Sequence, residues 1–310
     1  MTDSRDRFPD RLHVGTCSWK YSSWKGLIYS RNADGNYLQE YARHFDTVEI
    51  DQWFWSLHGE DKVTLPVPGV VEEYVRAVHE KFQFSVKVPN SITLTHFYGS
   101  YTGDPLVRNP HFLSRDLFLR FLDRLKPMHP FLGPLIFQFE YLNKQKMASQ
   151  SVFFEQLGPF IDACPDGFSY AIEIRNPNYI NTEYFRFLQS LRLDPVFIQG
   201  YYMPQIFPLF ETYGTVLGRR IIIRLIGPDR HGIEEKTRNR WNTIVTPRDN
   251  ELDQLVPALC LMLAAGKEIF LNVNNHYEGS APLSIGRIRA RMTSFGDAKT
   301  PFQYTAGDIQ

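Results

Sequence analysis

The chain has 310 residues, with 34 basic and 34 acidic side chains, so its formal net charge is zero. Zero net charge argues against a protein that binds nucleic acid or an anionic membrane through bulk charge, although a local basic cleft remains compatible with it. The length suits one large α/β domain or two smaller ones, with enough chain to bury a sizeable core.

The cysteines and the apolar runs indicate the compartment. Cys17, Cys164 and Cys260 show neither disulfide-like nor metal-like spacing, which favours a reducing compartment. The N-terminal stretch is polar, and no apolar run approaches the roughly 18 residues that a membrane span needs. We therefore expect a cytoplasmic protein with no membrane association. The sequence does not indicate an oligomeric state.

Short apolar runs, typical of buried strands, alternate with segments of helical periodicity. In chain order, the predicted strands are 12–17, 46–50, 82–88, 134–139, the first part of 168–177, 195–199, 220–226 and 268–274. The predicted helices are 36–44, 68–80, 114–126, 149–163, 181–191, a short one within 201–214, 252–265 and 284–294. Segments 51–61, 94–110 and 227–250 are predicted as loops.

This alternation predicts a single (β/α)8 TIM-like barrel over residues 1–310, with polar tails at about 1–10 and 297–310. No linker rich in Pro, Gly or Ser separates two halves. The alternative is a doubly wound sheet, but no predicted strand is followed by a G-x-G-x-x-G loop, which weakens a dinucleotide-binding version.

Polar side chains recur at the ends of the predicted strands. In this kind of barrel the C-terminal ends of the strands form the active-site face, and residues two apart on a strand share one face. The candidates are Glu49, Asp51, Lys87, Gln138, Glu140, Glu173, Arg175, Arg224, Asn272 and Asn274. Any one of them could instead form a structural ion pair, for example Glu49 with Lys87 or Glu173 with Arg224. As a set they favour a functional site, because isolated buried charges are costly.

The mixture of charges indicates a small anionic ligand. Lys87, Arg175 and Arg224 suit a phosphate or carboxylate, and Glu49 and Glu173 are the candidates for acid–base catalysis. A carboxylate fixed beside an arginine stays ionised. If Glu173 pairs with one of the arginines, Glu49 becomes the better proton donor.

Other chemistries have weaker support. Trp19 and Trp24, in the loop after the first strand, could stack on a ligand or simply pack the loop onto the barrel. The histidines show no metal-binding spacing, so no metal ligands are assigned and a divalent metal is not favoured. The chain carries no motif for an organic cofactor, and its cofactor is unknown. No G-x-S-x-G elbow is present.

The main hypothesis is therefore an enzyme acting on a small phosphorylated, carboxylated or sugar-like compound. The alternatives are a nucleic-acid-binding or endonuclease-like barrel, which is not favoured, glycoside hydrolysis by Glu49 and Glu173, and a non-catalytic ligand-binding barrel.

The chain also resembles the DUF72, or YecE-like, family. The matching stretches are VGTCSWKYSSWKGLIYS, YLQEYARHFDTVEIDQWFW, FSVKVP, LGPLIFQF, YAIEIRNPNY, IIIRLIG and NVNNHYEGSAP. The resemblance implies a TIM-like barrel and no known activity. It marks motif positions at Trp19, Trp24, Tyr29, Glu49, Lys87, Gln138, Glu173, Arg175, Arg224, Asn274 and Asn275.

Several positions depart from the family pattern. Ser18 stands where the family tends to have Gly, and Cys17 where it has Ser. Further departures are Asp51, Trp53, Phe54 and Trp55 after the second strand, and Asn176 and Tyr179 after Glu-x-Arg. Because these residues lie around the predicted site, they favour a divergent specificity or a loss of activity.

Overall fold

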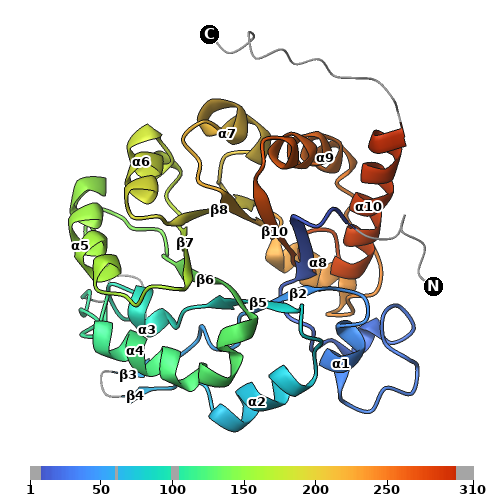
Figure 1. Ribbon diagram of the computed structural model, residues 1–310, viewed down its shortest axis with the longest axis horizontal. Helices are drawn as coiled ribbons and strands as arrows, with labels where there is room; N and C mark the ends of the chain where they lie inside the picture. Colours follow the sequence, from blue (N-terminus) through green and yellow to red (C-terminus); the bar gives the residue numbers. More distant parts are fainter. Residues whose placement is uncertain (1–7, 60–61, 99–104, 298–310) are drawn as a thin grey trace.

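The structure is a computed structural model that describes residues 8–59, 62–98 and 105–297. The predicted polar tails lie largely outside the described residues. The fold is a mixed α/β barrel, in which a ring of parallel strands is surrounded by helices (Figure 1).

Eight strands form one parallel sheet in the order β1-β10-β9-β8-β7-β6-β5-β2. Their bounds are β1 Leu12–Thr16, β2 Thr47–Ile50, β5 Gln83–Lys87, β6 Leu132–Gln138, β7 Ser169–Glu173, β8 Asp194–Gln199, β9 Arg220–Leu225 and β10 Glu268–Val273. The ends of the sheet meet where Cys17 bridges Glu49 and where the Ser18 N–H donates to the Glu49 carbonyl at 3.0 Å. The predicted (β/α)8 TIM-like barrel is thus confirmed.

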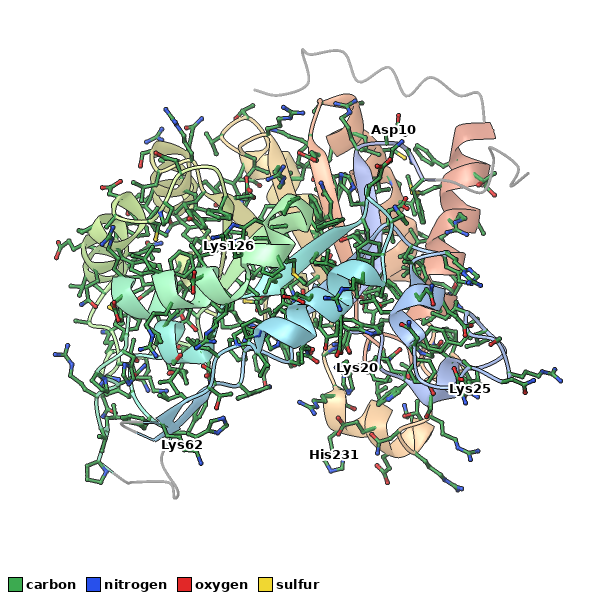
Figure 2. The ribbon with its side chains drawn as sticks, turned by 60° about the horizontal axis from the view of Figure 1, so that its bottom comes forward. Asp10, Lys20, Lys25, Lys62, Lys126 and His231 are labelled. Atoms are coloured by element: carbon green, nitrogen blue, oxygen red, sulfur yellow. The ribbon has the colours of Figure 1, made fainter. Side chains whose placement is uncertain are left out.

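Helices cover the outside of this ring. They are α1 Tyr37–Tyr41, α2 Pro68–Arg76, α4 Arg115–Arg124, α5 Gln150–Asp162, α6 Thr182–Ser190, α7 Ile206–Tyr213, α9 Asp249–Ala264 and α10 Ala281–Asp297. Helix α8 (Arg230–Thr237) differs, because it projects beyond the end of the strands in Figure 2, where His231 marks it. Short helices α3 (Asn90–Thr93), η2 (Ser22–Trp24), η3 (Lys126–Phe131) and η4 (Pro177–Tyr179) lie in the connections.

Side-chain caps explain where several helices begin. Asn36, Ser114, Ser149 and Asn181 each accept a hydrogen bond from the backbone N–H three residues later. This contact satisfies an N–H group that the first helical turn leaves without a partner. The predicted starts of α1, α4, α5 and α6 are therefore confirmed.

The prediction of loops was wrong for parts of two segments. Segment 227–250 contains helix α8, whose N-cap Asp229 accepts from the Gly232 N–H at 2.8 Å. This helix is strongly polar, so it lacks the apolar stripe that marks a core-facing helix. Segment 51–61 contributes strand β3 (Leu57–Gly59), which pairs with β4 (Lys62–Val63) in a separate two-stranded sheet.

Inside the barrel, an apolar layer lies next to a polar one. Ile136, Ala171, Val196, Ile222 and Phe270 form a buried apolar cluster. Two residues further along β6, β7, β9 and β10, on the same strand faces, stand Gln138, Glu173, Arg224 and Asn272. The alternation of the strands thus places a polar layer directly above the apolar one, at the C-terminal ends of the strands. We call this end the barrel mouth.

Candidate functional site in the barrel mouth

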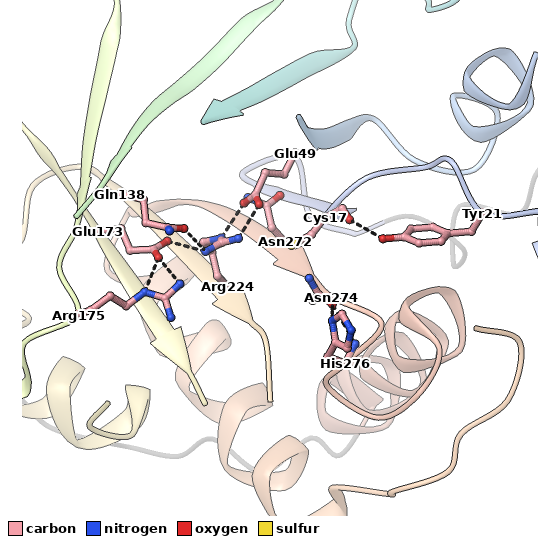
Figure 3. Close-up of polar contacts among 10 residues, drawn as sticks. All are labelled: Cys17, Tyr21, Glu49, Gln138, Glu173, Arg175, Arg224, Asn272, Asn274 and His276. Carbon is pink, nitrogen blue, oxygen red and sulfur yellow. Dashed lines mark hydrogen bonds and ion pairs between the residues drawn. The ribbon is translucent and has the colours of Figure 1, made fainter. Parts of the chain in front are cut away.

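Arg224 stands at the centre of the polar layer and is 3% exposed (Figure 3). Its Nε and Nη2 donate to the two carboxylate oxygens of Glu49 at 2.7 and 2.6 Å, and its Nη1 donates to Glu173 Oε2 at 2.7 Å. Gln138 Oε1 lies at 3.4 Å from the same Nη1. The planar guanidinium suits this role because its donors can serve two carboxylates at once.

Glu173 is shared between two arginines. Arg175 Nε and Nη2 approach its Oε1 at 2.8 and 2.6 Å, while Arg224 holds the other oxygen. Burial alone would raise the pKa of Glu173, but the charges of Arg175 and Arg224 outweigh it and lower the pKa to about 2. The ion pair between Glu173 and Arg224, which the sequence offered as a structural alternative, is therefore present.

Glu49 also pairs with Arg224, from the opposite side, and the Asn272 Nδ2 group donates to it at 3.3 Å. In the described residues, its partner is not the Lys87 that strand order suggested. The sequence predicts that Glu49 is the better proton donor if Glu173 pairs with an arginine. That condition holds, but Glu49 is bound to Arg224 in the same way, so the geometry gives Glu49 no advantage.

Lys87 ends β5, is 8% exposed, and makes no ion pair or hydrogen bond within the described part of the chain. Its ammonium lies over the ring of Phe54, 4.6 Å from the centroid, in a cation–π contact. Burial lowers the pKa of Lys87, and the Arg224 charge lowers it further, while Glu49 and Glu173 oppose the change. Its charge is therefore not balanced by a direct carboxylate contact within the described residues.

Asp51 follows β2 and is half-buried beside Lys87. Burial raises its pKa, against the opposing charge of Lys87. Neither Arg224 nor Arg175 bonds to it within the described residues. Glu140, the other candidate carboxylate outside the arginine network, pairs with Lys146 at 2.7 Å instead. Sequence reasoning placed Asp51 among the candidates but gave the acid–base role to Glu49 and Glu173. Strand alternation alone could not show which carboxylates the arginines occupy.

Arg175 has a second contact. The ring of Tyr201, in the loop after β8, lies 5.0 Å from its guanidinium carbon. Tyr201 itself is 43% exposed. Sequence reasoning missed this residue, because the aromatic run at 201–202 follows a strand with no charge at its end. The aromatic ring and Glu173 together hold Arg175 at the edge of the mouth, where its side chain remains 19% exposed.

The remaining predicted residues lie in less accessible positions. Trp19 and Trp24 are 3% and 0% exposed and belong to the apolar core, so their rings are enclosed by protein. The Asn274 Oδ1 atom accepts from the backbone N–H of His276 at 2.9 Å, and the Asn275 Oδ1 atom accepts from the Ala281 N–H at 2.8 Å. These asparagines therefore shape the turn after β10.

Neither a metal group nor a membrane helix is evident in the described residues. No three His, Cys, Asp or Glu side chains there are arranged to hold a metal ion. No described helix is long and apolar enough to cross a membrane.

Comparison with known proteins identifies the family. The family model described as "Protein of unknown function DUF72" matches residues 13–304. This chain belongs to the DUF72 family. The resemblance inferred from the motifs is thereby confirmed.

Relatives within and around DUF72 agree with this assignment. The curated protein "UPF0759 protein YecE" of Escherichia coli K12 is 26% identical over 168 residues, which is 54% of this chain and 50% of YecE. The match thus spans about half the length of that relative. A DUF72 crystal structure from Enterococcus faecalis superposes with a TM-score of 0.64 at 19% identity, covering 93% of this chain and 96% of that one.

A second DUF72 crystal structure, from Thermotoga maritima, gives a TM-score of 0.63 at 18% identity over 92% of this chain and 99% of the other. At these identities the structural likeness shows the fold alone.

Proposed function

We propose that this DUF72 chain is an enzyme acting on a small anionic compound, carboxylated or phosphorylated, bound in the barrel mouth. The observation that carries the proposal is Lys87, a nearly buried cation at the end of a barrel strand without an ion-pair partner in the described residues. A buried charge of this kind is costly to keep, and an incoming anion would offset the cost.

Arg175 is the second anion contact in this proposal. Its guanidinium uses two donors on Glu173 and keeps its remaining edge toward the mouth (Figure 3). Arg224, by contrast, is occupied by Glu49 and Glu173 and lies deeper. We therefore assign Arg224 a positioning role and give the direct anion contacts to Lys87 and Arg175.

Proton transfer falls to Asp51 rather than to the paired glutamates. A carboxyl group whose pKa is raised by burial is closer to the range in which it can both give and take a proton. Glu173, with its pKa lowered to about 2, remains a carboxylate at neutral pH and serves to hold both arginines. This arrangement supports acid–base chemistry on an anion without naming the substrate.

A thermal-shift screen tests the proposal. The panel holds phosphorylated metabolites, di- and tricarboxylates, sugars and short oligonucleotides, because a ligand that binds only the folded state raises the unfolding midpoint. We expect a shift with a small anion that disappears in Lys87→Met and Arg175→Ala. The matched controls are Lys126→Met and Arg76→Ala, which remove exposed cations outside the mouth. Unchanged shifts in both mouth variants would overturn the proposal.

Asp51→Asn separates binding from chemistry. This substitution removes a negative charge next to Lys87, so we expect anion binding to be retained or tightened. Turnover of a substrate identified in the screen should fall by about 10²-fold or more, as expected for the loss of a general acid or base. Full turnover in this variant would remove Asp51 from the mechanism while leaving the anion site intact.

A further inference from the structure

A hollow of about 560 Å³ lies between the loop after β1 and the chain that follows α8. Nine residues line it, and we call it the basic groove: Lys20, Tyr21, Ser22, Ser23, Lys25, Asn239, Arg240, Trp241 and Asn242. Lys20 and Lys25 lie at the same end of the molecule as α8 in Figure 2. The groove is thus on the C-terminal side of the barrel, apart from the Arg224 network.

Charge is the first argument that this groove binds a ligand. Its lining includes the cations Lys20, Lys25 and Arg240 and no acidic residue. Among the described residues, the Lys20 ammonium donates to two neutral partners, Gln52 Oε1 at 2.8 Å and the Tyr74 hydroxyl at 2.7 Å. In the described part of the chain, neither Lys25 nor Arg240 has an ion pair. A concave surface of one charge sign focuses the electrostatic potential and concentrates oppositely charged ligands.

The walls are held together without a ligand. The Trp241 N–H donates to Ser23 Oγ at 3.1 Å, joining segments more than 200 positions apart, and the rings of Tyr21 and Trp241 lie 6.4 Å apart. Trp241 is only 7% exposed, so its ring is packed against the protein. Arg238 and Asn239 adopt left-handed φ angles of 50° and 57°, which turn the chain sharply before Arg240. A preformed site loses less ordering entropy on binding.

We propose that the basic groove binds the phosphate or pyrophosphate group of a small phosphorylated compound. Serine hydroxyls and asparagine amides next to the three cations supply the directed hydrogen bonds that phosphate oxygens accept. The volume lies within the range of about 300–1,000 Å³ that is usual for small-molecule sites. Zero net charge favours a small ligand over a nucleic-acid strand.

Calorimetric titration with inorganic pyrophosphate at low ionic strength tests the groove. We expect saturable binding to the wild-type chain and at least about tenfold weaker binding to the double variant Lys25→Ala/Arg240→Ala, which removes two charge-assisted contacts. The control Lys62→Ala/Arg76→Ala removes the same two charges from exposed positions elsewhere and should bind as wild type does. The part of the pyrophosphate binding that Lys25→Ala/Arg240→Ala removes should persist in Arg175→Ala, because Arg175 does not line the groove.

Several results would overturn this inference. No saturable pyrophosphate binding, or equal loss in the groove and control variants, would show that the cations form no site. If Arg175→Ala lost pyrophosphate binding and Lys25→Ala/Arg240→Ala kept it, the anion would bind in the mouth instead. Tighter binding of a short oligonucleotide, with a steep salt dependence, would replace the small ligand by a nucleic-acid backbone. Because the groove and mouth variants are separate, failure here is distinguishable from failure of the proposed function.

Discussion

Replacing Arg224 by Met removes the cation that holds two buried carboxylates. The guanidinium donates three hydrogen bonds of 2.6–2.7 Å, two to Glu49 and one to Glu173. Arg175 still pairs with Glu173, but among the described residues the Glu49 carboxylate keeps only the Asn272 amide, at 3.3 Å. Removing one partner of a buried ion pair typically costs about 3–5 kcal/mol, so we expect the free energy of unfolding to fall by that amount at pH 7.

Urea denaturation measures the effect, and Arg220→Met on the same strand is its control. Arg220 pairs with Glu268 at 3.0 Å and with Asp194 at 3.7 Å, but its side chain is 28% exposed, so its loss should cost less than the loss of Arg224. A second comparison neutralises the whole network. The triple variant Arg224→Met/Glu49→Gln/Glu173→Gln should recover most of the lost stability, because no buried carboxylate is then left without its arginine.

The pH dependence follows from Glu173. Its pKa of about 2 in the folded state lies below the ordinary value of 4.5, so its pairing contributes stability that is present above pH 4.5 and lost as the pH falls toward 2. Arg224→Met removes part of that contribution. The difference in the free energy of unfolding between wild type and variant should therefore be largest above pH 4.5 and should decrease as the pH falls from 4.5 to 2. A cost at pH 7 below about 1 kcal/mol would refute the view that Arg224 compensates two buried charges.

Three further predictions concern single sites. Ser18 has a left-handed φ of 85°, so Ser18→Gly should leave stability unchanged or raise it by up to about 1 kcal/mol in urea denaturation, whereas Ser18→Val should lower it. Lys87→Met should raise the free energy of unfolding at pH 7 by about 1 kcal/mol while abolishing anion binding, as expected for a charge kept for function. Burial lowers the pKa of Lys87, so the protonated side chain destabilises the folded state. The stability that Lys87→Met gains should therefore shrink as the pH rises toward 10.5. A gain in the free energy of unfolding that stays constant with pH would contradict the reasoning. Cys17 is 2% exposed and burial raises its pKa well above the ordinary value, so in the native protein a thiol reagent should label Cys164 and Cys260 before Cys17, as peptide mapping would show.

The barrel could be predicted because its signal is local. Each strand is a short apolar run, and the step of two residues that puts Ile222 and Arg224 on one strand face is fixed by strand geometry. The polar layer of the mouth follows from that step. Helix α8 escaped prediction because its polar sequence gives no apolar stripe, although Asp229 at its N-cap was an available signal.

The partners within the mouth could not be predicted from sequence. Glu49 and Arg224 are 175 positions apart, and their contact depends on both side chains reaching across the barrel interior. Strand order alone makes Lys87 the natural partner of Glu49, since β2 and β5 are neighbours. The wide fork of the arginine reaches both carboxylates, and Lys87 turns to the Phe54 ring. At Ser18, in contrast, the structure explains a feature of the sequence pattern. The family tends to have Gly at this position, and the backbone there has a left-handed φ, which glycine adopts readily.

The most direct test of the central claim is a crystal structure of the protein soaked with the small anion that gives the largest thermal shift. We predict the anion in the barrel mouth, with its oxygens within hydrogen-bond distance of Lys87 Nζ and of the free edge of Arg175, and with the Arg224 network unchanged. An anion bound away from both residues, with Lys87 still over the Phe54 ring and the mouth unoccupied, would contradict the account.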